Sequence, residues 1–329
     1  MPNSHILTQG SLSVGFIGYG EAASAFVTGW RDALSSNKPL SNESPTNVSS
    51  LNIFAYDIKT DDTDTSETKW NDYKRDSIQG CRTLEELLNH ASVIFSLVTP
   101  DQSLSVSKRV SDITEQNTKT TSLANVIFLD CNSCSPNSKT ESEKYITQNG
   151  GRYIDVAVMS PVYPHKHQTP LLLSGEYSSD ALKIVQQLNM NASIAGKKVG
   201  QASAIKMIRS IMVKGMEALT AECLLAAKKL GVDQQVLSSL QHSFPESNWE
   251  EKSFYNLERM SVHGVRRSAE MMEAANMLKD LQLDNSITLA ASQWQKKIGD
   301  LKISVNVEKS SGNVNQYSTL SSEILNRLN

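Results

Sequence analysis

Two glycines near the N-terminus have the spacing of a phosphate-binding turn. The apolar run Val14–Ile17 ends at Gly18, Gly20 follows after one residue, and Ala23 is small. In the fingerprint G-x-G-x-x-(G/A), the first glycine allows a tight turn, the second lets the backbone approach a pyrophosphate, and the third position lets the helix pack against the strand. The helix N-terminus offers free N–H groups to phosphates. We therefore predict a dinucleotide-binding strand–turn–helix. The residues expected to contact the dinucleotide are Gly18, Tyr19, Gly20, Glu21, Ala22 and Ala23.

An acidic residue ends the next predicted strand. Leu51–Tyr56 alternates in polarity and is followed by Asp57, 37 residues beyond Gly20. The usual separation is about 20 residues, and a Ser/Asn-rich surface loop over 35–50 accounts for the excess. A carboxylate here accepts hydrogen bonds from both ribose hydroxyls and repels a 2′-phosphate, which favours NAD over NADP. Lys59 weakens this preference, and the alternative is that Asp57 only starts a turn.

A lysine begins a polar stripe on an otherwise apolar helix beyond the middle of the chain. At about 100° per residue, Lys206 shares one face with Arg209, Ser210, Lys214 and Glu217. Such a helix is mostly buried, and periodicity alone allows its stripe to face either solvent or a cleft. The position directly after the nucleotide-binding region favours the cleft. A partly buried lysine acts as a general acid or base, or it holds a carboxylate.

Length and composition limit the classes of function. The chain has 329 residues, 39% hydrophobic residues and a net charge of −3, which predicts a globular protein of two domains without a nucleic-acid or membrane-surface partner. No apolar run has membrane-spanning length, and the first residues lack the pattern of a signal peptide. Four cysteines do not form a disulfide framework, so we expect a cytoplasmic protein.

Strands and helices alternate in the first part of the chain and give way to helices in the second. Residues 1–199 predict a dinucleotide-binding α/β domain with a doubly wound, mostly parallel Rossmann-type sheet, and residues 200–329 predict an all-helical substrate and dimerisation domain. Ligands of such sheets bind at the carboxyl ends of the strands. The predicted strands cover about 12–18, 51–57, 92–98, 126–130, 152–158 and 171–174. The predicted helices cover about 21–34, 83–88, a stretch from 102, 136–149, 202–230, 233–242, 249–260, 268–281 and 285–301, with Gly264 as one of the breaks and an exposed loop over 61–80.

Four ordered motifs resemble the β-hydroxyacid dehydrogenases, the group related to 6-phosphogluconate dehydrogenase and 3-hydroxyisobutyrate dehydrogenase. They are Gly15–Gly20, Asn132–Pro136, Asp155–Val162 and the helix with Lys206. The amino-acid sequences of the glycine turn and of Lys206–Ser210 are most similar to those of a poorly characterised branch of this group, which has a distinct C-terminal domain. The resemblance covers nearly the whole chain and implies NAD(P)-dependent hydride transfer to or from a small 3-hydroxyacid or a related anionic alcohol.

The resemblance also implies roles for individual residues. Lys206 would exchange the hydroxyl proton of the substrate, Ser133 would hold the substrate carboxylate, and Thr99 and Pro100 would line the nicotinamide ribose. Arg209 replaces the asparagine usual in the family, and an arginine there suits a doubly anionic substrate or a salt bridge at the domain junction. Met159-Ser160-Pro161 replaces the usual Ser-Gly-Gly. The full set expected at the substrate is Asn132, Ser133, Met159, Ser160, Arg209 and Ser210, and Val98 joins the cofactor set.

Two other functions are compatible with the same sequence features. Imine reductases look similar and replace the lysine, and a dinucleotide-binding sensor without turnover would also carry the glycine turn. The pair Cys131 and Cys134 lacks the context of a redox or zinc site. His165 and His167 lack further ligands, so we expect no metal and interpret their segment as an exposed loop near the active-site mouth. The apolar helical domain suggests a homodimer.

Overall fold

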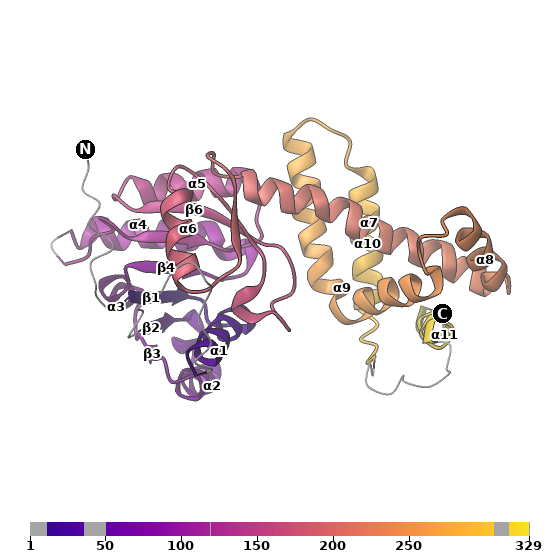
Figure 1. The fold of residues 1–329 in the computed structure, drawn as a ribbon, viewed down its shortest axis with the longest axis horizontal. Helices are drawn as coiled ribbons and strands as arrows, with labels where there is room; N and C mark the ends of the chain where they lie inside the picture. The colour runs from indigo at the N-terminus through magenta and orange to yellow at the C-terminus, as the bar shows by residue number, and fades with distance from the viewer. Residues whose placement is uncertain (1–11, 36–50, 119, 306–315, 329) are drawn as a thin grey trace. The chain divides into compact units, whose positions relative to one another are not determined.

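The computed structural model describes residues 12–35, 51–118, 120–305 and 316–328. The chain forms two compact units, residues 1–206 and 207–329 (Figure 1). The predicted loop over 35–50 lies outside the described residues, apart from Ser35. No helix of the described ranges is long and apolar enough to cross a membrane.

The first unit is built on one eight-stranded sheet in the order β3-β2-β1-β4-β5-β6-β7-β8. All neighbouring strands are parallel except β6 and β7, which are antiparallel. The strands are β1 Leu12–Ile17, β2 Leu51–Tyr56, β3 Gln79–Gly80, β4 Val93–Ser96, β5 Ile127–Asp130, β6 Arg152–Val158, β7 Leu171–Ser174 and β8 Ala192–Gly196. The carboxyl ends of β1 to β6 therefore meet along one edge, where a doubly wound sheet binds its ligands.

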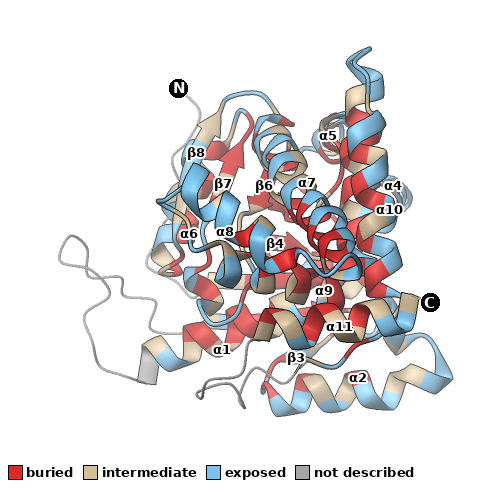
Figure 2. Ribbon diagram, turned by 90° about the vertical axis from the view of Figure 1, so that its right-hand side faces the viewer, coloured by how far each residue is buried: buried red, intermediate tan, exposed pale blue. Residues whose placement is uncertain are grey.

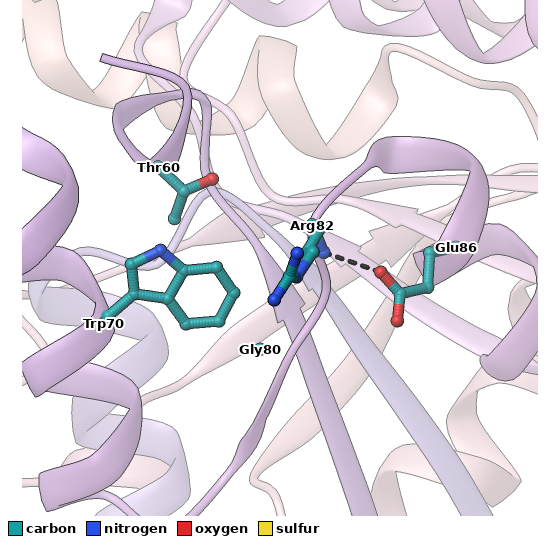
Figure 3. A pocket seen from close by; sticks show the side chains of 5 residues that line it. All are labelled: Thr60, Trp70, Gly80, Arg82 and Glu86. Atoms are coloured by element: carbon teal, nitrogen blue, oxygen red, sulfur yellow. Dashed lines mark hydrogen bonds between the residues drawn. The ribbon is translucent and has the colours of Figure 1, made fainter. Parts of the chain in front are cut away.

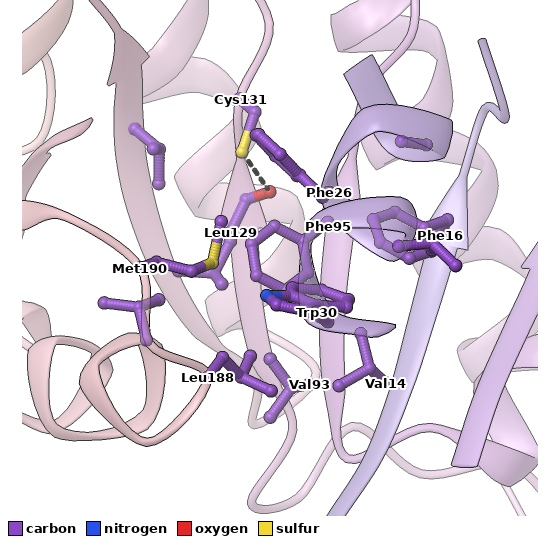
Figure 4. Close-up of a cluster of buried hydrophobic side chains, with 14 of the residues drawn as sticks. Val14, Phe16, Phe26, Trp30, Val93, Phe95, Leu129, Cys131, Leu188 and Met190 are labelled. Carbon is purple, nitrogen blue, oxygen red and sulfur yellow. Dashed lines mark hydrogen bonds between the residues drawn. The ribbon is translucent and has the colours of Figure 1, made fainter. Parts of the chain in front are cut away.

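Helices cover both faces of this sheet, because successive side chains of a buried strand point to opposite sides. On β1, Phe16 belongs to the core under α1, whereas Ile17 belongs to the core under α3 to α5. Phe16 stacks on Trp30 of α1 at 5.8 Å between ring centroids (Figure 4). The helices of this unit are α1 Glu21–Ser35, α2 Thr63–Arg75, α3 Leu84–His90, α4 Ser103–Gln116, α5 Pro136–Thr147 and α6 Ser178–Gln187, with short 3₁₀ helices η1 Ile58–Thr60, η2 Pro100–Gln102 and η3 Lys166–Gln168.

The predicted fold class is confirmed, but one predicted loop of the first unit is wrong. Residues 61–80 were expected to form an exposed loop, but α2 occupies most of them. The Asp62 side chain accepts the N–H of Asp64 and so caps the helix start. Only a narrow face of α2 is covered, because Lys69 and Tyr73 are buried and Trp70 is half-buried. This leaves little helical periodicity in a stretch rich in Asp, Ser and Thr. Helix α6 and strand β8 were not predicted.

The second unit is helical. Its elements are the main part of α7 Gln201–Lys229, with α8 Asp233–Ser243, α9 Trp249–Asp280, α10 Ser286–Gly299 and α11 Gln316–Leu328. Buried residues of α7, α9, α10 and α11 form one core. The ribbon of buried residues is red in Figure 2. The predicted break at Gly264 is wrong, since α9 continues through it. A Cβ at Gly264 would lie 2.2 Å from the carbonyl oxygen of Gln295, so this glycine permits close helix packing with α10.

Candidate functional site

The glycine turn has the geometry that a dinucleotide requires. Gly18 has a φ of +83°, and a Cβ there would lie 2.6 Å from the carbonyl oxygen of Leu97 at the end of β4. The fold itself therefore requires glycine at this position. At Gly20, by contrast, an added Cβ would meet no other part of the described chain within 4 Å. The space above Gly20 is open to a ligand, and α1 begins at Glu21, immediately beyond it.

Side chains from α2 and its C-cap support this turn. Lys69 donates from Nζ to the carbonyl oxygen of Tyr19 at 2.7 Å and pairs with Asp72 at 2.9 Å. The Tyr19 hydroxyl donates to Oδ2 of Asp76 at 2.8 Å. Burial, together with the hydrogen bond to Asp76, raises the pKa of Tyr19 far above its ordinary value. The residue between the two glycines is therefore anchored through both its backbone and its side chain.

Asp57 connects the turn to the end of β2. Its Oδ2 accepts the backbone N–H of Tyr19 at 2.8 Å, and its Oδ1 accepts the N–H of Lys59 at 3.0 Å. The second contact caps η1, so the turn-starting role considered from the sequence is present in the structure. Each carboxylate oxygen has a further lone pair for a ribose hydroxyl. Ribose binding by Asp57 stays a prediction.

The chain that follows β4 is fixed by Asn132, which follows β5. The Asn132 side-chain oxygen accepts the N–H of Val98 at 2.7 Å, and Nδ2 donates to Asp130 at 2.7 Å and to Ser96 at 3.0 Å. Asn132 is only 3% exposed. Its side chain holds Val98, and with it the start of the predicted nicotinamide segment Val98–Pro100, in place. Direct contact between Asn132 and a substrate stays a prediction.

Lys206 meets Ser133 across a sequence separation of 73 residues. The Lys206 Nζ donates to Ser133 Oγ at 2.5 Å. Ser133 follows the carboxyl end of β5, and Lys206 lies in the second turn of α7. Both side chains are half-buried. The structure thus brings together the two residues expected to handle the proton and the carboxylate of a substrate.

A fully buried ion cluster lies at the end of β5 and in the middle of the neighbouring strand β6. Lys139 Nζ is 2.9 Å from Asp130 Oδ1 and 3.5 Å from Asp155 Oδ1, and no side chain of the three is more than 1% exposed. Burial alone would lower the pKa of Lys139, but the carboxylates outweigh burial and raise it. Tyr153 also donates to Asp130, at 2.6 Å. One ammonium group therefore links the two neighbouring strands.

Asp155 holds the first turn of α7. It accepts the N–H of Gly200 at 3.1 Å and, from Ser203, the N–H at 3.0 Å and the hydroxyl at 2.6 Å. Lys206 comes three residues after Ser203, so the same contacts fix its position. Asp130 ends β5 and Asp155 lies opposite it on the neighbouring strand β6, but neither they nor Lys139 were assigned a role from the sequence.

The remaining predicted substrate residues lie at two places. Met159 and Ser160 are half-exposed and follow β6, on the same sheet edge as Ser133. Arg209 and Ser210 lie farther along α7, in the second unit, and their roles stay predictions. Two members of the polar stripe have partners within the second unit, because Lys214 pairs with Glu270, and Glu217 pairs with Arg267.

The segment with His165 and His167 matches its prediction as an exposed loop only in part, since His165 is exposed but the residues after it are not a free loop. It contains η3, which packs on α1, and Lys166 pairs with Asp32 at 2.6 Å. His167 is buried, with Nε2 at 3.3 Å from Nδ2 of Asn189. Burial lowers the pKa of His167. We assign this histidine to packing.

Comparisons with known proteins agree with this architecture. Residues 227–298 match a domain of unknown function (DUF1932). An uncharacterized 28.5 kDa protein of Methanothermus fervidus is 25% identical over 267 residues, which cover 80% of this chain and 89% of that protein. A conserved hypothetical protein of Sinorhizobium meliloti 1021 is 26% identical, with 97% of both chains covered and a TM-score of 0.72.

More distant structures share the fold. A conserved protein of unknown function, described as similar in structure to 3-hydroxyacid dehydrogenases, is 24% identical, with 88% of this chain and 97% of that chain covered and a TM-score of 0.66. The 3-hydroxyisobutyrate dehydrogenase of Mycobacterium tuberculosis, in a structure with L-serine, is 12% identical, with 95% and 98% covered and a TM-score of 0.65. An imine reductase variant of Myxococcus stipitatus, in complex with NAD⁺, is 16% identical, with 88% and 93% covered and a TM-score of 0.53. The resemblance to the β-hydroxyacid dehydrogenases is thereby confirmed at the level of the fold, and this chain has the 3-hydroxyisobutyrate dehydrogenase architecture with a C-terminal helical unit that contains the DUF1932 match.

Proposed function

We propose that this protein is a nicotinamide-dinucleotide-dependent oxidoreductase acting on a small 3-hydroxyacid or a related anionic alcohol. The observation that carries the proposal is the hydrogen bond of 2.5 Å between Lys206 Nζ and Ser133 Oγ, at the sheet edge that also ends in the glycine turn. A group that exchanges a proton and a group that orients a carboxylate are what alcohol oxidation requires beside a dinucleotide.

The residues of the turn fit a dinucleotide. The open space above Gly20 admits a pyrophosphate, and the N-terminus of α1 supplies N–H groups for it. Asp57 would hold the adenosine ribose, and Thr99 and Pro100 would lie along the nicotinamide ribose. When bound, the dinucleotide supplies hydride transfer at its nicotinamide ring. The protein contributes binding and orientation.

Lys206 performs the proton step in this proposal. In the direction of oxidation, its neutral amine accepts the hydroxyl proton of the substrate as the carbinol carbon loses hydride. In the direction of reduction, its ammonium returns that proton to the carbonyl oxygen. Ser133 orients the substrate carboxylate, and Asp155 keeps the helix that carries Lys206 in register. Arg209 is a candidate partner for a second anionic group.

The test compares Lys206→Ala with Lys183→Ala, which removes an exposed lysine of α6. Hydroxyacids are screened with each dinucleotide, and binding of the dinucleotide is measured by fluorescence. We expect Lys206→Ala to lower turnover by a factor of about 10² to 10⁴ while the dinucleotide affinity changes less than twofold. Unchanged turnover would exclude Lys206 as the proton-exchanging group.

The same screen separates the other candidate functions. Turnover of cyclic imines with no turnover of hydroxyacids would favour imine reduction. Dinucleotide binding without turnover of either class would favour a sensor. Binding of neither dinucleotide would contradict all three readings.

We also propose that two copies of the chain associate through α7. Large apolar side chains spaced three or four residues apart form an exposed stripe on this helix, and exposed apolar patches of this kind mark protein interfaces. They are Ile205 at 43% exposure, Ile208 at 55%, Met212 at 67%, Met216 at 37% and Leu219 at 67%. We expect a dimer in sedimentation experiments and a shift to monomer in Met212→Glu. A monomeric wild type at micromolar concentration would contradict this proposal.

A further inference from the structure

A pocket of about 580 Å³ lies beyond the carboxyl ends of β2 and β3, outside the predicted cofactor residues. Figure 3 shows the five residues that line it, with Trp70 of α2 on one side and Arg82 on the other. They are Thr60, Trp70, Gly80, Arg82 and Glu86. The pocket combines an indole ring, a hydroxyl group, a guanidinium group and the carboxylate of Glu86.

The pocket adjoins the glycine turn through α2 and η1. Lys69 of α2 binds the carbonyl oxygen of Tyr19, and its neighbour Trp70 lines the pocket. Asp57 caps η1, which contains Thr60 of the pocket. Asp57 is the residue predicted at the adenosine ribose, so the pocket lies beside the position expected for that ribose.

The local structure presents Arg82 to the pocket. The Glu86 carboxylate accepts the backbone N–H of Arg82 at 2.6 Å, and the N–H of Glu86 donates to Thr83 Oγ1 at 3.1 Å. These reciprocal contacts fix the chain between β3 and α3. The Arg82 guanidinium has no hydrogen bond or ion pair among the residues that the structure describes. At Gly80, an added Cβ would lie 2.3 Å from the Trp70 ring, so this glycine makes room for the indole.

Asp57 does not by itself exclude a phosphate from this region. Both of its oxygens already accept backbone N–H groups, from Tyr19 and Lys59. These contacts partly balance the negative charge of Asp57. They also give the carboxylate a structural role that does not require a bound ribose. The sequence preference for NAD rests on this one carboxylate, whereas the structure adds an exposed guanidinium group nearby.

We propose that this pocket receives the adenosine 2′-phosphate of NADP(H), with Arg82 as its cationic partner. The inference rests on the proposed function, since it requires a bound dinucleotide. A guanidinium group donates two parallel hydrogen bonds to a phosphate. The Thr60 hydroxyl already donates to the carbonyl oxygen of Asp57 at 2.8 Å, so Arg82 is the donor that the phosphate uses. The Trp70 ring forms the wall of the pocket opposite Arg82. Arg82 thereby determines which of the two dinucleotides the enzyme prefers.

The test measures dissociation constants of NADPH and NADH for the wild type, Arg82→Gln, Lys59→Gln and the control Lys183→Gln. Thermal unfolding confirms that each variant is folded. We expect the wild type to prefer NADPH and Arg82→Gln to weaken NADPH binding about tenfold or more, with NADH binding within twofold. Binding of adenosine 2′,5′-bisphosphate should weaken in Arg82→Gln as binding of NADPH does. Binding of adenosine 5′-monophosphate should stay unchanged, as binding of NADH does.

Three results would overturn the inference. The first is a wild type that binds NADH more tightly than NADPH. The second is an Arg82→Gln variant that weakens both dinucleotides equally or neither. The third is a loss of NADPH binding in Lys59→Gln but not in Arg82→Gln. Each of these leaves the proposed function intact, whereas a wild type that binds neither dinucleotide would contradict both proposals.

Discussion

The two halves of the candidate site are stabilised by different means. At the proposed catalytic half, Asp130, Lys139 and Asp155 form a buried ion cluster, and Asp155 also holds the first turn of α7, the helix that carries Lys206. At the cofactor half, the turn depends on a glycine with positive φ and on the partly exposed carboxylate Asp57. A buried ion cluster tolerates almost no change, because removal of one charge leaves the others without compensation.

The comparison shows what each half needs. Proton transfer depends on the position of one amine within fractions of an ångström, so a rigid buried support suits it. In general, many backbone contacts share the binding of a dinucleotide, so a side chain at the rim of such a site can be substituted without loss of the whole binding energy. Cofactor preference is therefore easier to change by mutation than the catalytic group.

The largest effect is expected when the buried cluster loses its cation. Lys139→Met keeps most of the side-chain volume but leaves Asp130 and Asp155 buried without an ammonium group. We expect a loss of about 3–5 kcal/mol in the free energy of unfolding, measured by urea denaturation. Lys144→Met, at an exposed position of the same helix, should change it by less than about 0.5 kcal/mol. Equal effects of the two variants would mean that the cluster contributes little to stability.

The two turn glycines should respond differently to the same substitution. Gly18→Ala places a methyl group against the Leu97 carbonyl oxygen at positive φ, which should cost about 1–3 kcal/mol of stability. Gly20→Ala meets only open space, so its stability should change by less than about 1 kcal/mol while dinucleotide affinity falls about tenfold or more. Denaturation and fluorescence titration of both variants check this. Unchanged affinity in Gly20→Ala would argue against a pyrophosphate above that residue.

The carboxylate under the turn should make stability depend on pH. Burial alone would raise the pKa of Asp76, but hydrogen bonds from Arg75, Ser24 and Tyr19 outweigh burial and hold the pKa below its ordinary value. The unfolded chain therefore binds the proton first, and the stabilisation is lost as pH falls below about 4. Asp76→Asn should flatten the fall in unfolding free energy over that range. An identical pH profile in the variant would exclude this role for Asp76.

The smallest effect concerns the thiols. Burial raises the pKa of Cys131 to about 12 and also raises the pKa of Cys134. Cys223 is exposed. We expect iodoacetamide at pH 8 to label Cys223 in minutes and the C-x-x-C pair only after unfolding, as measured by peptide mass spectrometry. Rapid labelling of Cys134 in the folded protein would contradict its inert packing role.

The sheet was predictable where the chain has clear apolar strands. Residues 152–158 and 171–174 are strands over the ranges expected from their patterns. Helix α2 was missed because two aromatic residues, Trp70 and Tyr73, provide nearly all of its apolar face. Strand β8 is half-exposed at a sheet edge, so it lacks the apolar run of the interior strands.

The candidate site was predictable only in part. The glycine turn is encoded within six residues, and the contact between Ser133 and Lys206 joins two residues that were named in advance. Lys139 could not be found in this way, because its partners lie on two different strands and only the folded sheet brings them together. Arg82 follows a strand of two residues, which no pattern in the sequence indicates.

The anchoring of Tyr19 has a consequence for shortened versions of this protein. A deletion that joined residue 60 to residue 78 would keep every interior strand of the sheet and would look harmless as the trimming of a surface excursion. It would nevertheless remove Lys69 and Asp76, whose side chains hold the backbone and the hydroxyl of Tyr19. Shortened versions of the first unit must therefore retain α2 and its C-cap.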